Sequence, residues 1–240
     1  MQLAPGVYRF DTGPFNWYLV EERGRLTLID AGFPGHYATL LKGLATLGKS
    51  PSDIEAVLLT HAHADHTGFA ARLRKEFKIP VFIHRDDVSA LTRRLNLPWY
   101  GLLSNAWRPF VRRLLWHATW HGVFRMSTTP DAFPLVDGQE LDFPGRPRVI
   151  HVPGHTAGET VFHLPERGVL FSGDAIVTRD LMSGGNGGPQ LAHRLLNSDH
   201  RQAQVAAARL RELGRATLMP GHGEPWTGEM QEALELAAVQ

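Results

Sequence analysis

The fold of this chain is decided by the stretch Leu58-Leu59-Thr60-His61-Ala62-His63-Ala64-Asp65-His66-Thr67-Gly68. Its apolar start is typical of a buried strand, and a helical pattern begins directly after it. Three imidazoles and a carboxylate fall in the short loop between them, where alternate positions point the same way. We therefore predict a metal site at the end of a strand, in which His61 and His63 bind one cation while Asp65 and His66 turn toward a neighbouring one.

Length and composition limit the kinds of protein that this chain can be. A chain of 240 residues can bury a substantial core, and we expect one domain spanning residues 1–240. The formal net charge of +1 gives no general argument for nucleic acid as a partner. With no cysteine, a bound metal must be held by histidines and carboxylates, so a di-zinc or iron site fits.

Targeting signals are not evident in the sequence. Residues 1–6 lack a basic region followed by an apolar one, and no uninterrupted apolar run approaches the ~18 residues of a membrane span. We therefore expect a cytoplasmic protein without a transmembrane segment.

The chain alternates between strand and helix patterns on both sides of the histidine loop. Antiparallel strands come first and β-α-β alternation follows, which favours an α/β (α+β) fold over an all-β one. Residues 183–189 are rich in glycine and read as a flexible loop. The predicted strands are 7–10, 15–20, 25–30, 56–59, 81–84, 148–152, 160–164, 168–172 and 217–223, and the predicted helices are 37–47, 69–77, 201–213 and 229–239.

Residues 88–130 interrupt this rhythm. The segment holds six arginines, four of the six tryptophans and no acidic residue. We predict a helical insertion that forms a lid over a site for a small-molecule substrate, partly apolar and able to carry negative charge. Its candidate substrate contacts are Arg112, Arg113, Trp107 and Trp116. Three alternatives are a helical hairpin that only packs on the body, a membrane-surface element and a homodimer contact.

Further ligand-type residues follow other apolar strands. His155, Asp174 and His222 each come after such a strand and next to a glycine or turn residue. Together with the histidine loop they supply seven ligands, enough for two cations with open positions, as a catalytic site requires. The remaining histidines have no such setting and are expected at the surface, in the core or in support of the site: His36, His84, His117, His121, His151, His163, His193 and His200.

Four motifs resemble the metal motifs of the metallo-β-lactamase-fold hydrolase superfamily, and they occur in the same order. They are Thr60-His61-Ala62-His63-Ala64-Asp65-His66, Pro153-Gly154-His155-Thr156-Ala157-Gly158, Ser172-Gly173-Asp174 and Pro220-Gly221-His222-Gly223. The resemblance runs from Asp30 to about His222, apart from the insertion. It implies a four-layer αββα sandwich of two similar halves, with the metals at one edge of the paired sheets.

The resemblance also implies roles for single residues. It assigns His61, His63 and His155 to the first metal and Asp65, His66 and His222 to the second, with Asp174 bridging both. Asp30 matches a position that supports the site from behind the ligands. Zinc is expected, with manganese or iron as alternatives, and Asp65 is the expected catalytic residue that takes a proton from, or orients, a hydroxide shared by the two cations.

Departures from individual members narrow the expected reaction. Asp174 stands where true β-lactamases of this fold carry a different residue. The chain resembles glyoxalase II-type thioesterases and lactonases, although Val177 replaces the tyrosine that lactonases commonly carry. We therefore expect a dinuclear hydrolase of an ester, lactone or thioester. The alternatives are a persulfide dioxygenase with a single iron and a binding module that has lost its catalytic activity.

Overall fold

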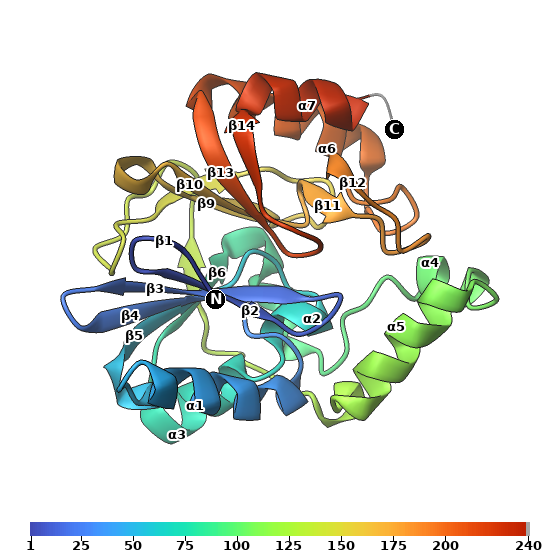
Figure 1. The fold of residues 1–240 in the computed structure, drawn as a ribbon. Coiled ribbons are helices and arrows are strands. Elements are labelled where there is room, and N and C mark those ends of the chain that lie inside the picture. Colours follow the sequence, from blue (N-terminus) through green and yellow to red (C-terminus); the bar gives the residue numbers. More distant parts are fainter. Residues whose placement is uncertain (239–240) are drawn as a thin grey trace.

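The computed structural model describes residues 1–238, and its two main sheets pack face to face with helices on both outer sides (Figure 1). This arrangement confirms the predicted mixed α/β fold and its four αββα layers. The predicted end of the closing helix at Val239 lies outside the described residues. No helix of residues 1–238 is both long and apolar enough to cross a membrane.

The first sheet is formed by the N-terminal half of the chain. Short turns join its first four strands antiparallel, whereas β4 to β7 run parallel because longer connections, including helices α1 (Tyr37–Thr46) and α3 (Ala70–Phe77), carry the chain back. In sheet order the strands are β1 (Gln2–Ala4), β2 (Val7–Asp11), β3 (Asn16–Glu22), β4 (Arg25–Ile29), β5 (Ile54–Leu58), β6 (Val81–His84) and β7 (Phe133–Leu135).

The second sheet is formed by the C-terminal half and is covered by two helices, α6 (His200–Ala207) and α7 (Met230–Ala238). Beyond α6 the chain continues as a 3-10 helix over Ala208–Leu213, and Gly214 ends it with a φ of 66°. In sheet order the strands are β14 (Trp226–Glu229), β13 (Arg215–Pro220), β10 (Val169–Gly173), β9 (Thr160–Leu164) and β8 (Arg148–His151).

The glycine-rich segment 183–189 corrects one sequence prediction. The composition predicts a flexible loop, but strand β12 (Asn186–Gln190) begins inside it and pairs antiparallel with β11 (Val177–Arg179). Glycines have no side chain and therefore give no hydrophobic alternation. The strand exists because its backbone pairs with that of β11, which no side-chain pattern reveals.

Three apolar layers hold the sandwich together. The central layer lies between the two sheets and includes Tyr18, Leu58, Phe162 and Phe171. One outer layer packs α1 and α3 on the first sheet, and the other packs α6 and α7 on the second. Most of the apolar residues that indicated these helices and strands thus lie in the three layers, although Leu41 of α1 is 40% exposed.

Truncating Phe162 tests the central layer. This side chain on β9 is fully buried between the sheets, so Phe162→Ala should lower the free energy of unfolding by about 3–5 kcal/mol, since it removes apolar contacts and leaves a cavity. Denaturant unfolding measures the change. The matched control is Val205→Ala on α6, whose side chain is 69% exposed and whose loss should cost less than about 0.5 kcal/mol. Equal effects of the two substitutions would contradict this packing.

Segment 88–130 contains two helices, α4 (Trp99–Ser104) and α5 (Pro109–Trp120), which lie beside the sandwich (Figure 1). Proline at the first position of α5 fits a helix start. The inner face of α5 buries Val111, Leu114 and Ala118 against Phe15 and Phe33 of the body. Its outer face exposes two tryptophans, so this helix is amphipathic with aromatic residues on the solvent side as well.

Candidate metal centre

The ligand-type residues meet because parallel strands end at the same edge of each sheet. In the first sheet β4 and β5 run parallel, and Asp30 and His61 follow their carboxyl ends. In the second sheet β10 and β13 run parallel, which brings Asp174 beside His222. A backbone hydrogen bond of 2.9 Å from Thr160 N to Thr60 O joins the two sheets beside this edge.

All seven predicted ligands lie close together and are buried. Their donor atoms fall into overlapping groups in which every atom lies within 4.8 Å of the others. The first group is His61, His63 and His155, and the second group is Asp65, His66 and His222. A further set, His61, His66 and Asp174, links the two groups. The structure thus brings together the residues that the resemblance assigned to each ion.

The first group presents three imidazole nitrogens to one point. His63 Nδ1 lies 3.1 Å from His61 Nε2 and 2.9 Å from His155 Nε2. Burial lowers the pKa of all three histidines, and the neighbouring imidazoles add to the effect at His61 and His63. The three rings are therefore neutral at neutral pH, which is the form that binds a metal.

The second group combines a carboxylate with two imidazoles. Asp65 Oδ2 lies 3.6 Å from His66 Nε2 and 3.5 Å from His222 Nε2. Burial disfavours the charged form of both histidines, but the carboxylates around them outweigh it, so the pKa of His66 and of His222 is raised. Burial raises the pKa of Asp174, yet His222 and His66 lower it well below its usual value. The centre thus keeps an ionised carboxylate between two groups of imidazoles.

Asp30 lies behind the predicted ligands and contacts one of them. Its Oδ2 lies 2.8 Å from His66 Nδ1, and its Oδ1 accepts a hydrogen bond of 2.8 Å from Thr60 N. Its φ of 61° is in the left-handed region, which aspartate adopts more readily than most residues. The backbone at the end of β4 is therefore held in an unusual conformation so that this carboxylate fixes the ring of His66.

Three polar residues that the sequence did not single out also support the centre. Glu159 is fully buried, lies 3.3 Å from His61 Nδ1 and accepts a hydrogen bond from Asp174 N. Asp87 accepts from Ala62 N, Thr156 Oγ1 and Gly158 N. Asn197 Oδ1 lies 2.9 Å from His155 Nδ1. Glu159 directly follows the Pro-Gly-His-Thr-Ala-Gly motif, a usable signal, whereas nothing in the sequence indicated Asp87 or Asn197.

The donor chemistry fits divalent transition-metal ions. Within residues 1–238, the buried atoms His66 Nε2 and Asp174 Oδ1 have no hydrogen-bond partner, and they lie 3.5 Å apart. Unpaired buried polar atoms are costly, so their presence indicates a ligand. Five histidines and two carboxylates are suited to zinc, iron or manganese.

A narrow apolar cavity opens on this centre. Its free volume is about 40 Å³, and His63, Asp65, His155 and Asp174 form its polar end. The rest of its wall is apolar and comes from the body and from segment 88–130: Phe15, Phe33, Leu97, Pro98, Leu102, Leu114, Leu115, Ala118, Leu181 and Leu196. The insertion therefore contributes part of the cavity wall, and its role as a lid stays a prediction.

The four candidate substrate contacts are placed elsewhere. Arg112, Arg113 and Trp116 line an outer hollow of α5, and Trp107 lines another with Arg113. Trp107 and Trp116 are 72% and 68% exposed, and none of the four is among the described residues that line the cavity. The reason is that α5 has apolar residues on both faces, and the face with Val111, Leu114 and Ala118 is the one that turns inward. This placement does not support direct contact with a substrate at the centre.

Known proteins of similar sequence include several named as hydrolases. The chain is 26% identical to "Probable metallo-hydrolase YflN" of Bacillus subtilis, and the alignment covers 95% of this chain and 88% of YflN. It is 30% identical to "Uncharacterized protein YobT" of the same species, covering 69% of this chain and 64% of YobT. A bovine protein, "Acyl-coenzyme A thioesterase MBLAC2", is 29% identical over 51% of this chain and 42% of its own length.

Two solved structures share this fold, and one of them is from Thermus thermophilus. The metallo-β-lactamase family protein TTHA1429 of that organism is 27% identical with a TM-score of 0.69, covering 99% of this chain and 80% of its own. TTHA1623 in a di-iron-bound form is also 27% identical, with a TM-score of 0.65, covering 97% and 100% of the two chains. The family model described as "Metallo-beta-lactamase superfamily" matches residues 11–222. The chain therefore belongs to the metallo-β-lactamase superfamily.

Proposed function

We propose that this metal-dependent hydrolase uses two divalent ions, most simply zinc, to cleave an ester, lactone or thioester that carries an apolar acyl group. The observation that carries the proposal is a cluster of seven side chains of metal-ligand type, four of which form one end of an apolar cavity. YflN, a probable metallo-hydrolase by name, and the thioesterase MBLAC2 support the reaction class.

The residues divide between the two ions as their distances suggest. His61, His63 and His155 would hold one ion, and Asp65, His66 and His222 the other. Asp174 would contact both, since its oxygens lie 3.4 Å from His155 Nε2 and 3.5 Å from His66 Nε2. When bound, a pair of divalent ions lowers the pKa of water and polarises a carbonyl group.

Asp65 is the residue that would handle the proton. It is both near the imidazoles of His66 and His222 and exposed to the cavity. Its carboxylate can therefore orient the attacking water and accept a proton from it at the oxygen that does not bind the ion. No serine or cysteine nucleophile is required by this arrangement.

The apolar wall selects the acyl part of the substrate. Phe15, Phe33 and Leu114 exclude water from the polar end and offer apolar contact to a hydrocarbon chain. The free volume of about 40 Å³ holds only a few water molecules, so an acyl group must displace side chains of the insertion as it enters. We therefore expect the rate to depend on acyl length.

Metal content and substrate length test the proposal together. Protein purified without added metal or chelator should contain about two zinc or manganese ions per chain by elemental analysis. Lactones and acyl thioesters of increasing acyl length should then differ in kcat/KM. About one iron per chain, with oxygen uptake in the presence of a persulfide, would instead indicate the dioxygenase alternative.

Asp30→Asn tests how the second group is held. The amide keeps the size of the side chain but removes the charge that faces His66 Nδ1 at 2.8 Å. Removal of a residue that hydrogen-bonds to a metal ligand typically lowers metal affinity about 10- to 100-fold, and we expect a decrease of this size. Competition with a chromophoric chelator measures the change. An unchanged affinity would show that Asp30 does not support a metal ligand.

A further inference from the structure

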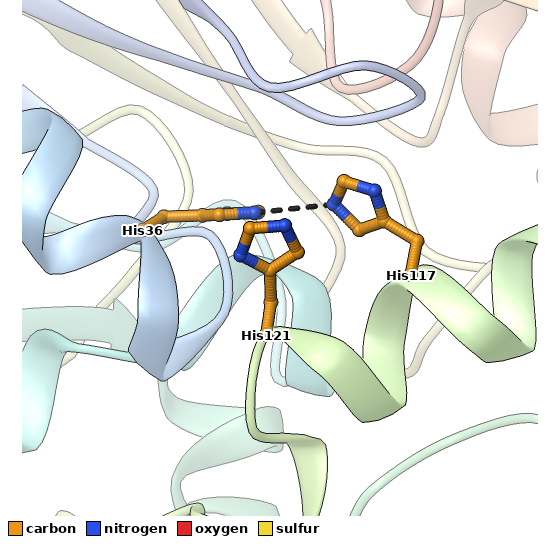
Figure 2. Close-up of side chains that lie close together, drawn as sticks. All are labelled: His36, His117 and His121. Carbon is orange, nitrogen blue, oxygen red and sulfur yellow. Dashed lines mark hydrogen bonds between the residues drawn. The ribbon is translucent and has the colours of Figure 1, made fainter.

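A separate cluster of histidines lies where α5 meets the body of the protein (Figure 2). His36 ends the 3-10 turn Pro34–His36, whereas His117 lies in the last turn of α5 and His121 directly follows it. Residues four apart face the same side of a helix, a spacing that zinc-binding helices use. None of these three residues belongs to the donor groups of the candidate metal centre.

The three rings converge closely. His36 Nε2 lies 3.2 Å from His117 Nε2, and each ring offers one nitrogen within 4.8 Å of the others. The ring of His121 lies 4.4 Å from that of His36 and 4.2 Å from that of His117, between centroids (Figure 2). Nitrogens bound to one tetrahedral zinc ion lie about 3.3 Å apart, given Zn–N bonds of about 2.0–2.1 Å. The cluster therefore needs little movement to bind an ion.

The protonation of the cluster also suits a metal. Burial, together with the other imidazoles, lowers the pKa of His36 to about 3 and that of His117 to about 4, and burial lowers the pKa of His121. The rings are thus neutral at neutral pH and available as ligands. Three imidazoles without a carboxylate are suited to zinc, copper or nickel rather than to magnesium or calcium.

We propose that His36, His117 and His121 form an additional metal site that binds one divalent transition-metal ion, zinc in the first place, and fastens α5 to the body. Solvent reaches the cluster through the outer hollow that His117 and His121 line, so water can supply a fourth ligand. Phe15 contacts both His117 and His222, with ring centroids 5.3 Å and 5.4 Å away, and so lies between this site and the candidate metal centre.

Binding changes one hydrogen bond in the body. His36 Nδ1 accepts a hydrogen bond of 3.1 Å from Phe33 N and lies 3.4 Å from Thr12 Oγ1. When Nε2 binds the ion, the ring proton is on Nδ1, where Thr12 Oγ1 can accept it and the bond from Phe33 N is given up. In return, the bound ion links α5 to the body beside the backbone hydrogen bond of 2.8 Å from Gly35 N to His121 O.

Counting bound zinc tests the site independently of activity. The protein with its catalytic ions in place is dialysed against increasing Zn²⁺, and bound zinc is measured by elemental analysis. The wild type should bind one more zinc ion per chain than either His117→Gln or His121→Gln does. The matched control His163→Gln, which changes a histidine outside all the clusters, should bind as the wild type does. Absence of the additional equivalent in the wild type, or its persistence in both cluster variants, would overturn the proposal.

Hydrogen exchange tests the fastening of α5. Zn²⁺ in excess of the catalytic ions should slow amide exchange in residues 109–120 at least tenfold in the wild type and leave it unchanged in His121→Gln. Binding of the extra ion without slower exchange would refute its role in fastening the helix. Neither measurement depends on hydrolysis. A failure to find a substrate would therefore count against the proposed function, whereas absence of the additional zinc ion would count only against this second site.

Discussion

Replacing His63 with alanine is expected to lower kcat/KM by at least about a thousandfold, a loss of about 4 kcal/mol of transition-state stabilisation. His63 Nδ1 lies 3.1 Å from His61 Nε2 and 2.9 Å from His155 Nε2, so its removal leaves two of the three nitrogens of the first group. Steady-state kinetics on the best ester or thioester substrate measures the effect, and elemental analysis should show a matching loss of metal.

The fold should survive this substitution. His63 follows β5 in a loop and is not part of the three apolar layers, so circular dichroism and the unfolding midpoint of the metal-free protein should stay close to those of the wild type. His163→Ala on β9 is the matched control and should keep full activity. If His63→Ala retained more than about a tenth of the wild-type kcat/KM, His63 would not belong to the catalytic centre.

Most of the fold was predictable because its elements carry local patterns. The parallel core strands are short apolar runs, and helices such as α1 show leucines at helical spacing. Elements that depend on pairing with a neighbouring strand of the sheet were missed. β1, β7, β11 and β12 are short and lack alternation, and they become strands only because neighbouring strands supply their hydrogen bonds.

The candidate site was predictable to the extent that its residues occur in motifs. His61, His63, Asp65 and His66 are adjacent in sequence, and His155, Asp174 and His222 each follow an apolar strand beside a glycine or turn residue. Asp87 shows the limit, because it lies in a 3-10 turn and reaches the site through two backbone groups and one hydroxyl group of two other loops. Such contacts follow from the tertiary fold and have no sequence spacing of their own.

The insertion shows a second limit of sequence patterns. Composition alone singled out its arginines and tryptophans as candidate substrate contacts. In the structure, Leu114 and Ala118 of α5 face the centre instead, and Trp116 and Trp120 are 68% and 75% exposed. Both faces of this helix are rich in apolar side chains, so periodicity alone does not decide which one is buried. Packing against Phe15 and Phe33 decides it, and this contact joins residues about a hundred positions apart.

Asp174→Asn is expected to reduce the bound metal to less than one ion per chain and kcat/KM by about a thousandfold or more. Asp174 is 3% exposed, its Oδ2 lies 3.0 Å from His222 Nε2, and it is the only carboxylate among the described residues that faces both donor groups of the centre. The amide keeps the shape of the side chain but removes one of the two negative charges that offset two divalent ions. Elemental analysis and kinetics on the same preparation measure both effects.

The control for this change is Asp142→Asn, which neutralises an exposed carboxylate and should leave metal content and activity unchanged. His222→Gln adds a second comparison, because this residue belongs to only one donor group and its loss should leave about one ion per chain. A dinuclear centre therefore predicts a graded loss of metal: two ions in the wild type, one in His222→Gln and less than one in Asp174→Asn. If His222→Gln kept its full metal content and activity while Asp174→Asn lost both, a single ion held without His222 would explain the chemistry, and the proposed pair of ions would be wrong.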